Sequence, residues 1–175
     1  MNIIEFFELS AGKWFSQRTV HDLVSGKLQA GKSNLVIEFL PSSDANVVQL
    51  CQQHETDPSL VWGGLQLSWE GTVDGNPKKQ TGSTTLVAVR HREQENEGVL
   101  LQSRPNFNNQ TLKGRYIMGE DEVLTLITES VDFYAEERFW YLIPNLRLRT
   151  SMVKRKDGLN HAAFCSEIRM LTQSK

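Results

Sequence analysis

The segment Pro144-Asn145-Leu146-Arg147-Leu148-Arg149-Thr150-Ser151 alternates between apolar and charged residues, a period typical of a β-strand. Successive side chains of a strand point to opposite faces, so Arg147 and Arg149 share one face and the two leucines share the other. Two guanidiniums on one strand face would stand about 7 Å apart. The segment therefore predicts a strand with one cationic and one apolar face.

A second strand pattern, Phe164 to Met170, follows after a turn at Lys156-Asp157-Gly158. It places Cys165, Glu167 and Arg169 on a common face. Paired as a hairpin, the two strands would set a carboxylate among several arginines. Such an array is either a surface charge ladder or the lining of a site for a ligand with carboxylates. Composition favours the surface ladder, because charged groups are seldom buried unpaired, but periodicity does not say which face is inside.

Strand and turn patterns dominate the rest of the chain. Helical spacing occurs at the start, from Asn2 to Ser10, and again after the N-cap options Ser42-Ser43-Asp44, and it is lost at Glu55-Thr56-Asp57-Pro58. The predicted strands are Gly12 to Asp22, Lys32 to Leu40, Gly64 to Asp74, Gly82 to Arg92, Gly98 to Arg104, Leu112 to Gly119, Glu122 to Val131, Phe133 to Ile143, Leu146 to Lys156 and His161 to Thr172. About ten strands in sequential antiparallel order favour an all-β fold, a closed up-and-down barrel resembling lipocalins and fatty-acid-binding proteins. A β-sandwich is the alternative.

Composition limits the classes of function. The chain has 175 residues, a net charge of −2 and a pI near 6.1. We therefore expect one domain over residues 1–175, with no nucleic-acid partner and no membrane insertion. The expected location is the cytoplasm, or the plastid stroma in an alga. Cys51 and Cys165 are expected to be reduced, and the scattered histidines imply no metal.

A set of motifs spread over the whole chain points to one family. Gly12-x-Trp14 with an arginine on a terminal strand resembles the lipocalin and calycin pattern, in which the tryptophan closes one barrel end. The further motifs are Phe6-Phe7, Ser10-x-Gly12-x-Trp14-x-Ser16-x-Arg18-Thr19-x-His21, Trp69-x-Gly71-Thr72, Gly82-Ser83-Thr84, Gly114-Arg115-Tyr116-x-Met118-Gly119, Leu124 to Glu129, Glu136-Glu137-Arg138, Pro144 to Ser151 and Ser166 to Met170. Together they closely resemble the S/U-type phycobiliprotein lyases, the CpcS/CpeS/CpcU family.

The resemblance implies a ten-stranded lipocalin-like domain that binds an open-chain phycobilin, either phycocyanobilin or phycoerythrobilin, as its substrate. Members of this family attach the bilin through a thioether to a cysteine of a phycobiliprotein subunit, which would be phycocyanin, allophycocyanin or phycoerythrin. No tightly bound cofactor is expected. Two alternatives remain: a non-catalytic U-type partner of an S-type lyase, and a calycin carrier of another small acid.

The resemblance also assigns roles to residues, because a bilin carries two propionates and conjugated rings. Arg147 and Arg149 are expected to bind the propionates, and Glu167, the expected catalytic residue, to contact the pyrrole nitrogens or donate a proton to the ethylidene system. Trp69 is expected as a wall of the site. Arg18, His21 and Arg169 are further candidate bilin ligands, and Trp14 is expected to close the barrel. The arginine face is then inside, which leaves the leucines outside and predicts a homodimer or a heterodimer with a sister lyase.

Overall fold

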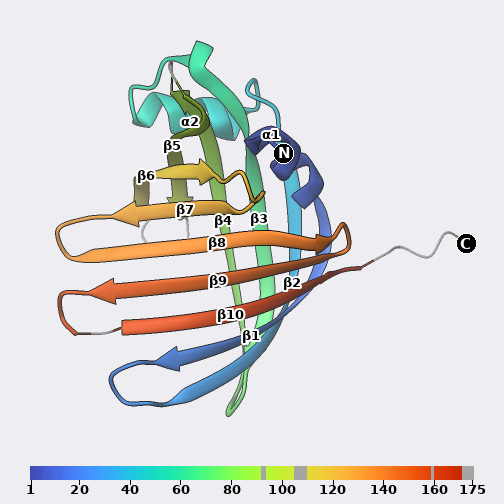
Figure 1. Ribbon diagram of the computed structural model, residues 1–175, viewed down its shortest axis with the longest axis vertical. Helices are drawn as coiled ribbons and strands as arrows, with labels where there is room; N and C mark the ends of the chain where they lie inside the picture. Colours follow the sequence, from blue (N-terminus) through green and yellow to red (C-terminus); the bar gives the residue numbers. More distant parts are fainter. Residues whose placement is uncertain (92–93, 105–109, 159, 171–175) are drawn as a thin grey trace, which may run out of the picture.

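In the computed structural model, which describes residues 1–91, 94–104, 110–158 and 160–170, ten antiparallel strands form a closed barrel (Figure 1). Around the barrel the order is β1-β10-β9-β8-β7-β6-β5-β4-β3-β2, so every strand pairs with its sequence neighbours and β1 closes on β10. The strands are β1 (Gly12–Asp22), β2 (Leu28–Leu40), β3 (Val61–Val73), β4 (Asn76–His91), β5 (Gln94–Arg104), β6 (Gln110–Met118), β7 (Leu124–Glu129), β8 (Phe133–Ile143), β9 (Leu146–Arg155) and β10 (Asn160–Arg169). The predicted up-and-down barrel is confirmed, and the sandwich alternative is wrong.

Helix α1 (Ile3–Ser10) covers the barrel end at which β1 begins and β10 finishes. Asn2 caps it in a capping box with Glu5, which satisfies backbone N–H groups of the first turn. Its Phe6 and Phe7 are buried in the main core cluster, together with Trp14. The aromatic residues near the start of the sequence thus fill one end of the barrel.

Helix α2 (Ala45–Gln53) follows β2, capped by Asp44, and lies on the outside of the barrel. Its Val47, Leu50 and Cys51 pack in a second core cluster with Val87 and Leu101, which point outward from β4 and β5. A 3₁₀ turn, η1 (Pro58–Leu60), then leads into β3. Among the described residues no helix has the length and apolar character needed to cross a membrane.

Several predicted strand boundaries were wrong. β3 begins at Val61, because the pairing with β4 shifts register between Val61 and Gly63 and the bulge is made by Trp62. Gly63 adopts a φ of +147°, which other residues rarely adopt. β2 begins at Leu28 rather than Lys32, and β5 at Gln94 rather than Gly98. The predicted strand ends at Arg92 and Thr172 lie outside the described residues.

The register around the barrel closure fixes which residues share the interior. Glu167 on β10 pairs with Arg147 on β9 and with Ser16 on β1. Arg149 pairs in turn with Cys165 and with Phe139 of β8. Paired residues of antiparallel strands point to the same face. The cationic face predicted from the sequence is therefore brought together with Glu167 inside the barrel.

Candidate functional site

A cavity of about 320 Å³ occupies the barrel interior. Its charged residues come from β1, β8, β9 and β10, and leucines of β2, β3, β4, β5 and β7 line the rest together with Trp69 and small polar residues. The lining residues that matter for the chemistry are Arg18, Trp69, Glu137, Arg147, Arg149 and Glu167. A cavity of this size with a few polar groups on one side has the composition of a small-molecule site.

The most buried charges form an ion pair between Arg147 and Glu167, which are 3% and 1% exposed. Arg147 Nε and Nη2 lie 2.7 Å and 2.6 Å from Glu167 Oε2. Burial alone would raise the pKa of Glu167, but Arg147 and Arg149 outweigh it and hold that pKa below its usual value. Glu167 is therefore ionised at neutral pH.

Glu167 Oε1, the other carboxylate oxygen, is less fully bonded. Ser16 Oγ donates to it across 3.5 Å, and Arg149 Nε lies 3.6 Å away, beyond hydrogen-bond distance. This Arg149 Nε is buried and has no hydrogen-bond partner in the part of the chain that the structure describes. A buried donor without a partner and a buried acceptor with one long hydrogen bond thus lie side by side at the cavity wall.

A second carboxylate, Glu137, meets Arg149 from β8. Arg149 Nη1 donates to Glu137 Oε1 at 3.0 Å, and its Nη2 donates to Cys165 Sγ at 3.3 Å. The Arg149 and Glu137 side chains are 25% and 36% exposed. Glu137 was not predicted as a site residue. Its inward position could have been inferred from the strand alternation Glu137, Phe139, Tyr141, but Glu136 is an equally acidic neighbour.

Arg147 also connects the cavity to α1. Its Nη1 donates to Ser10 Oγ at 2.9 Å, and Ser10 Oγ lies 2.9 Å from the Tyr141 hydroxyl. The guanidinium carbon lies 5.1 Å from the centre of the Trp14 ring, within cation–π distance. All three guanidinium nitrogens of Arg147 therefore have partners within the protein.

Trp14 and Arg169 form the barrel closure. Trp14 is fully buried and donates through Nε1 to the Ser10 carbonyl at 2.9 Å. The Arg169 guanidinium lies 4.2 Å from the centre of the Trp14 ring and donates to the carbonyls of Leu9 and Ala11. Arg169 is not among the described residues that line the cavity. Its assignment as a bilin ligand must therefore be corrected to a closure residue, as in the calycin pattern.

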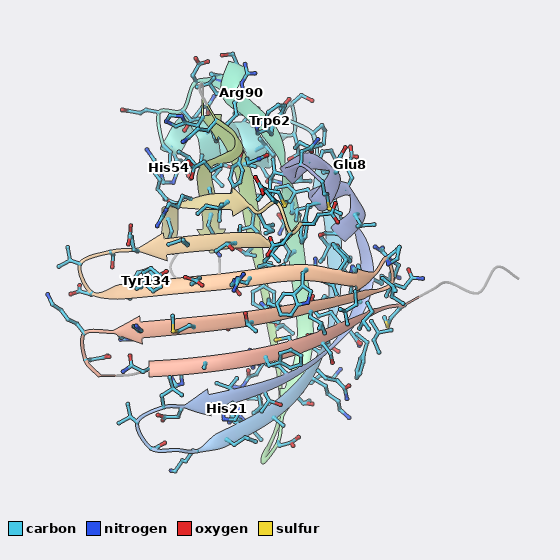
Figure 2. All side chains as sticks on the ribbon, viewed as in Figure 1. Glu8, His21, His54, Trp62, Arg90 and Tyr134 are labelled. Atoms are coloured by element: carbon cyan, nitrogen blue, oxygen red, sulfur yellow. The ribbon has the colours of Figure 1, made fainter. Side chains whose placement is uncertain are left out.

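The remaining candidates divide between the two faces of the barrel wall. Arg18 and Trp69 line the cavity. His21 is exposed, and the alternation of β1, in which Trp14 and Ser16 point inward, places it on the outer face (Figure 2). The predicted role of His21 as a bilin ligand therefore has no support in the geometry, because alternate residues of β1 face opposite sides and His21 is on the side away from Trp14 and Ser16.

The cysteines differ in environment. Cys51 is buried outside the barrel, whereas Cys165 points inward beside Arg149. Burial raises the pKa of both thiols, and Arg149 only partly opposes this at Cys165. Both are therefore neutral thiols at physiological pH. The described residues contain no group of three or more His, Cys, Asp or Glu side chains arranged to hold a metal ion.

Comparison with known proteins identifies relatives over nearly the whole chain. The family described as CpeS-like protein matches residues 2–170. "Chromophore lyase CpcS/CpeS 1" of Trichodesmium erythraeum (strain IMS101) is 55% identical over 170 residues, covering 97% of this chain and 98% of that protein. "Chromophore lyase CpcS/CpeS" of Thermosynechococcus vestitus (strain NIES-2133 / IAM M-273 / BP-1) is 46% identical, covering 97% and 93%.

A solved structure agrees with these matches. The S-type phycobiliprotein lyase CPES from Guillardia theta superimposes with a TM-score of 0.87 at 30% identity, covering 99% of this chain and 95% of that chain. Sequence and structure therefore agree over the barrel and both helices, and the chain belongs to the CpeS-like family of chromophore lyases.

Proposed function

We propose that this chromophore lyase binds an open-chain phycobilin in the barrel cavity and delivers it to a cysteine of a phycobiliprotein subunit. The observation that carries the proposal is the pair of groups at the cavity wall, Arg149 Nε, which has no hydrogen-bond partner among the described residues, and Glu167 Oε1, whose hydrogen bond from Ser16 is long. A bilin offers both matching groups, since it has propionate oxygens and pyrrole N–H groups. Groups left unsatisfied in a buried site favour the ligand that pairs with them.

The geometry refines the roles that the sequence suggested. Arg147 has no free guanidinium nitrogen, so its role is to fix Glu167 rather than to hold a propionate. Arg149 is the more accessible cation and exchanges Glu137 for a propionate at little cost, because partly exposed ion pairs contribute only about 0–1 kcal/mol. Trp69 supplies an aromatic surface for a pyrrole ring.

In this scheme the lyase supplies position and charge, and the acceptor cysteine is the nucleophile. The thiol adds across the ring A ethylidene double bond: sulfur bonds to the exocyclic carbon, the proton ends on the adjacent ring carbon, and nothing leaves. Glu167 against the inner nitrogens stabilises the cationic, protonated tetrapyrrole, which is the more electrophilic form. Glu137, a second carboxylate at the same wall, would accept the thiol proton and pass it to that ring carbon.

An apolar surface on the outside of the barrel supports self-association, which we propose as part of the function. We call it the outer patch: Phe15, Phe164 and Ile168 on β1 and β10, and Leu146 and Leu148 on β9. Phe164 and Ile168 are 46% and 51% exposed. Phe15, Leu146 and Leu148 are half-buried around them, and monomers seldom leave such a contiguous apolar patch on their surface. A dimer, with itself or with a sister lyase subunit, would cover them.

The test is to mix the purified protein with phycocyanobilin, first alone and then with an apo-phycobiliprotein. Binding should red-shift and sharpen the bilin absorbance, and transfer should give a zinc-fluorescent band on the denatured acceptor. Binding without transfer in every acceptor tested, restored by an S-type partner, would assign the U-type role instead. Absence of any bilin binding would overturn the proposal.

A further inference from the structure

Three neighbouring hairpin turns stand at the end of the barrel opposite α1. They connect β1 to β2, β9 to β10 and β7 to β8, and they follow one another around the barrel because these strands are neighbours (Figure 1). We call them the mouth turns, residues 23–27, 156–158 and 130–132. At the other end, α1, Trp14 and Arg169 close the barrel. A ligand, and any protein that reacts with it, therefore reaches the cavity from the end that carries the mouth turns.

Backbone hydrogen bonds outside the strand ladders tie the mouth turns to one another. The Leu23 N–H donates to the Asn160 carbonyl at 2.9 Å, which links the first turn to the start of β10. The Lys156 N–H donates to the Asp132 carbonyl at 2.9 Å, which links the β9–β10 turn to the β7–β8 turn. The three turns therefore form one connected rim rather than three independent loops.

Two of these turns have apolar tips that are exposed to solvent. Leu23 and Val24 are 58% and 68% exposed, and Val131, in the β7–β8 turn, is 83% exposed. The first turn is fixed from within, because the Asp22 carboxylate accepts hydrogen bonds from the N–H groups of Val24 and Ser25 at 2.9 Å and 3.0 Å. An aliphatic side chain on an ordered turn loses little freedom when a partner covers it. The tips are thus suited to contact an apolar protein surface.

The cavity reaches almost to the mouth turns. Thr128 and Ala135 both line it and pair across β7 and β8. Only one further pair, Glu129 with Tyr134, separates them from the turn that carries Val131. One residue adds about 3.3 Å along a strand, so the cavity wall ends within about 7 Å of this turn. A cysteine that reacts with a chromophore in the cavity therefore brings its own protein against the mouth turns.

We propose that the mouth turns are the docking surface for the acceptor phycobiliprotein subunit, with Leu23, Val24 and Val131 contacting apolar surface around its cysteine. The proposal rests on the proposed function and specifies where its protein partner binds. The occupant is the acceptor without its chromophore. A protein that awaits a conjugated, largely apolar chromophore has an unfilled apolar site, and attachment covers that site. The mouth turns therefore bind the finished product less well, which favours its release.

The first test measures transfer kinetics in the double variant Leu23→Ser with Val24→Ser and in Val131→Ser. All three side chains are exposed, so thermal melting should be unchanged and bilin affinity should stay within about twofold of wild type. The KM for the apo-acceptor should rise about tenfold in the double variant, with kcat at saturating acceptor within about twofold. Val48→Ser is the control, because it replaces an exposed valine on α2, outside the mouth turns. A wild-type KM in both mouth variants would overturn the docking surface.

Photo-crosslinking without bilin separates this proposal from the proposed function. With p-benzoylphenylalanine at position 24 or 131, irradiation of bilin-free lyase and apo-acceptor should give a lyase–acceptor adduct, and at position 48 it should give none. The acceptor that already carries its chromophore should give less adduct, and equal amounts would overturn the preference for the apo form. Adducts formed by a lyase that binds no bilin would overturn the proposed function and keep the docking surface. Bilin transfer without these adducts, or adducts between two lyase copies in their place, would overturn the docking surface.

Discussion

Glu167 and Arg147, twenty residues apart on β10 and β9, share a buried ion pair in which two guanidinium nitrogens meet one carboxylate oxygen. The pairing occupies Oε2 and leaves Oε1 with the longer contacts to Ser16 and Arg149 at the cavity wall. A charged acid is thereby held in a fixed orientation before any ligand binds, which is the condition for electrostatic preorganisation.

Glu167→Gln should reduce both stability and chromophore activation. It leaves the Arg147 charge buried without a counter-charge, so the free energy of unfolding at pH 7 should fall by about 3–5 kcal/mol. On protein that is still folded, the red shift of bound bilin and its transfer should be lost. Urea unfolding and bilin absorbance measure the two effects. Wild-type transfer rate and stereochemistry in this variant would make Glu167 a structural residue only.

The Arg147–Glu167 ion pair predicts that the free energy of unfolding falls at acidic pH. The pKa of Glu167 is lowered in the folded state, so its stabilisation is present above the unfolded pKa of about 4.3 and is lost as the pH falls through the lowered value. Wild-type unfolding free energy should therefore decline below about pH 4. Glu167→Gln should lack this part of the decline. Parallel curves for the two proteins would contradict the assignment.

Glu137→Gln should affect transfer and leave the fold intact. The Glu137–Arg149 pair is partly exposed, so its loss should change the free energy of unfolding by no more than about 1 kcal/mol. If Glu137 exchanges protons with bound bilin, the transfer rate should fall at least tenfold, within the range of general acid catalysis. Single-turnover transfer measures this, and Glu136→Gln on the outer face of β8 is the matched control. An unchanged rate would limit Glu137 to a charge partner.

Trp14→Ala should destabilise the barrel by about 3–5 kcal/mol, because it removes a fully buried aromatic side chain at the closure. Arg169→Gln should lower the melting temperature as well, since Arg169 covers Trp14 and bonds two carbonyls. Bilin affinity of the folded Arg169→Gln protein should stay within about twofold of wild type, as expected for a closure residue. Strongly weakened binding would restore Arg169 as a ligand.

The double variant Cys51→Ser and Cys165→Ser should retain transfer. Both thiols are neutral at pH 7 and buried, and a serine at position 165 can still accept a bond from Arg149. Mass spectrometry of the lyase during turnover should find no covalent bilin. A folded but inactive double variant would instead indicate a covalent intermediate on the lyase.

Phe164→Glu with Ile168→Lys should abolish self-association without unfolding the barrel, because both side chains are about half exposed. Sedimentation velocity at tens of micromolar should change from dimer to monomer. If the wild type stays monomeric and forms no mixed complex with an S-type partner, the proposal that a second subunit covers the outer patch is wrong.

Much of this architecture follows from local patterns. The alternation of Arg147 and Arg149, the turn at Gly158 and an N-cap within Ser42-Ser43-Asp44 each depend on a few neighbouring residues and were predicted correctly, with Asp44 as the cap. The bulge at Trp62 was not predicted, because a bulge adds one residue to a strand without changing the composition of that strand.

The site was harder to predict than the fold. Whether an acid such as Glu136 or Glu137 points inward depends on one step of register, and a one-residue shift exchanges the faces. His21 was assigned to the cavity although its parity with Trp14 places it outside. Arg169 has inward parity, but it lies so close to the barrel end that it contacts Trp14 and does not line the cavity.

Pairing of β1 with β10 closes the barrel, and it also limits when during synthesis the barrel can form. Ser16 and Glu167 are 151 residues apart, so this seam can form only when β10 has been synthesised. Contacts of such long sequence separation are slow to form. Glu167, the buried carboxylate of the cavity wall, is thus added only with the final strand. A growing chain therefore has no closed cavity until the seam between β1 and β10 has formed.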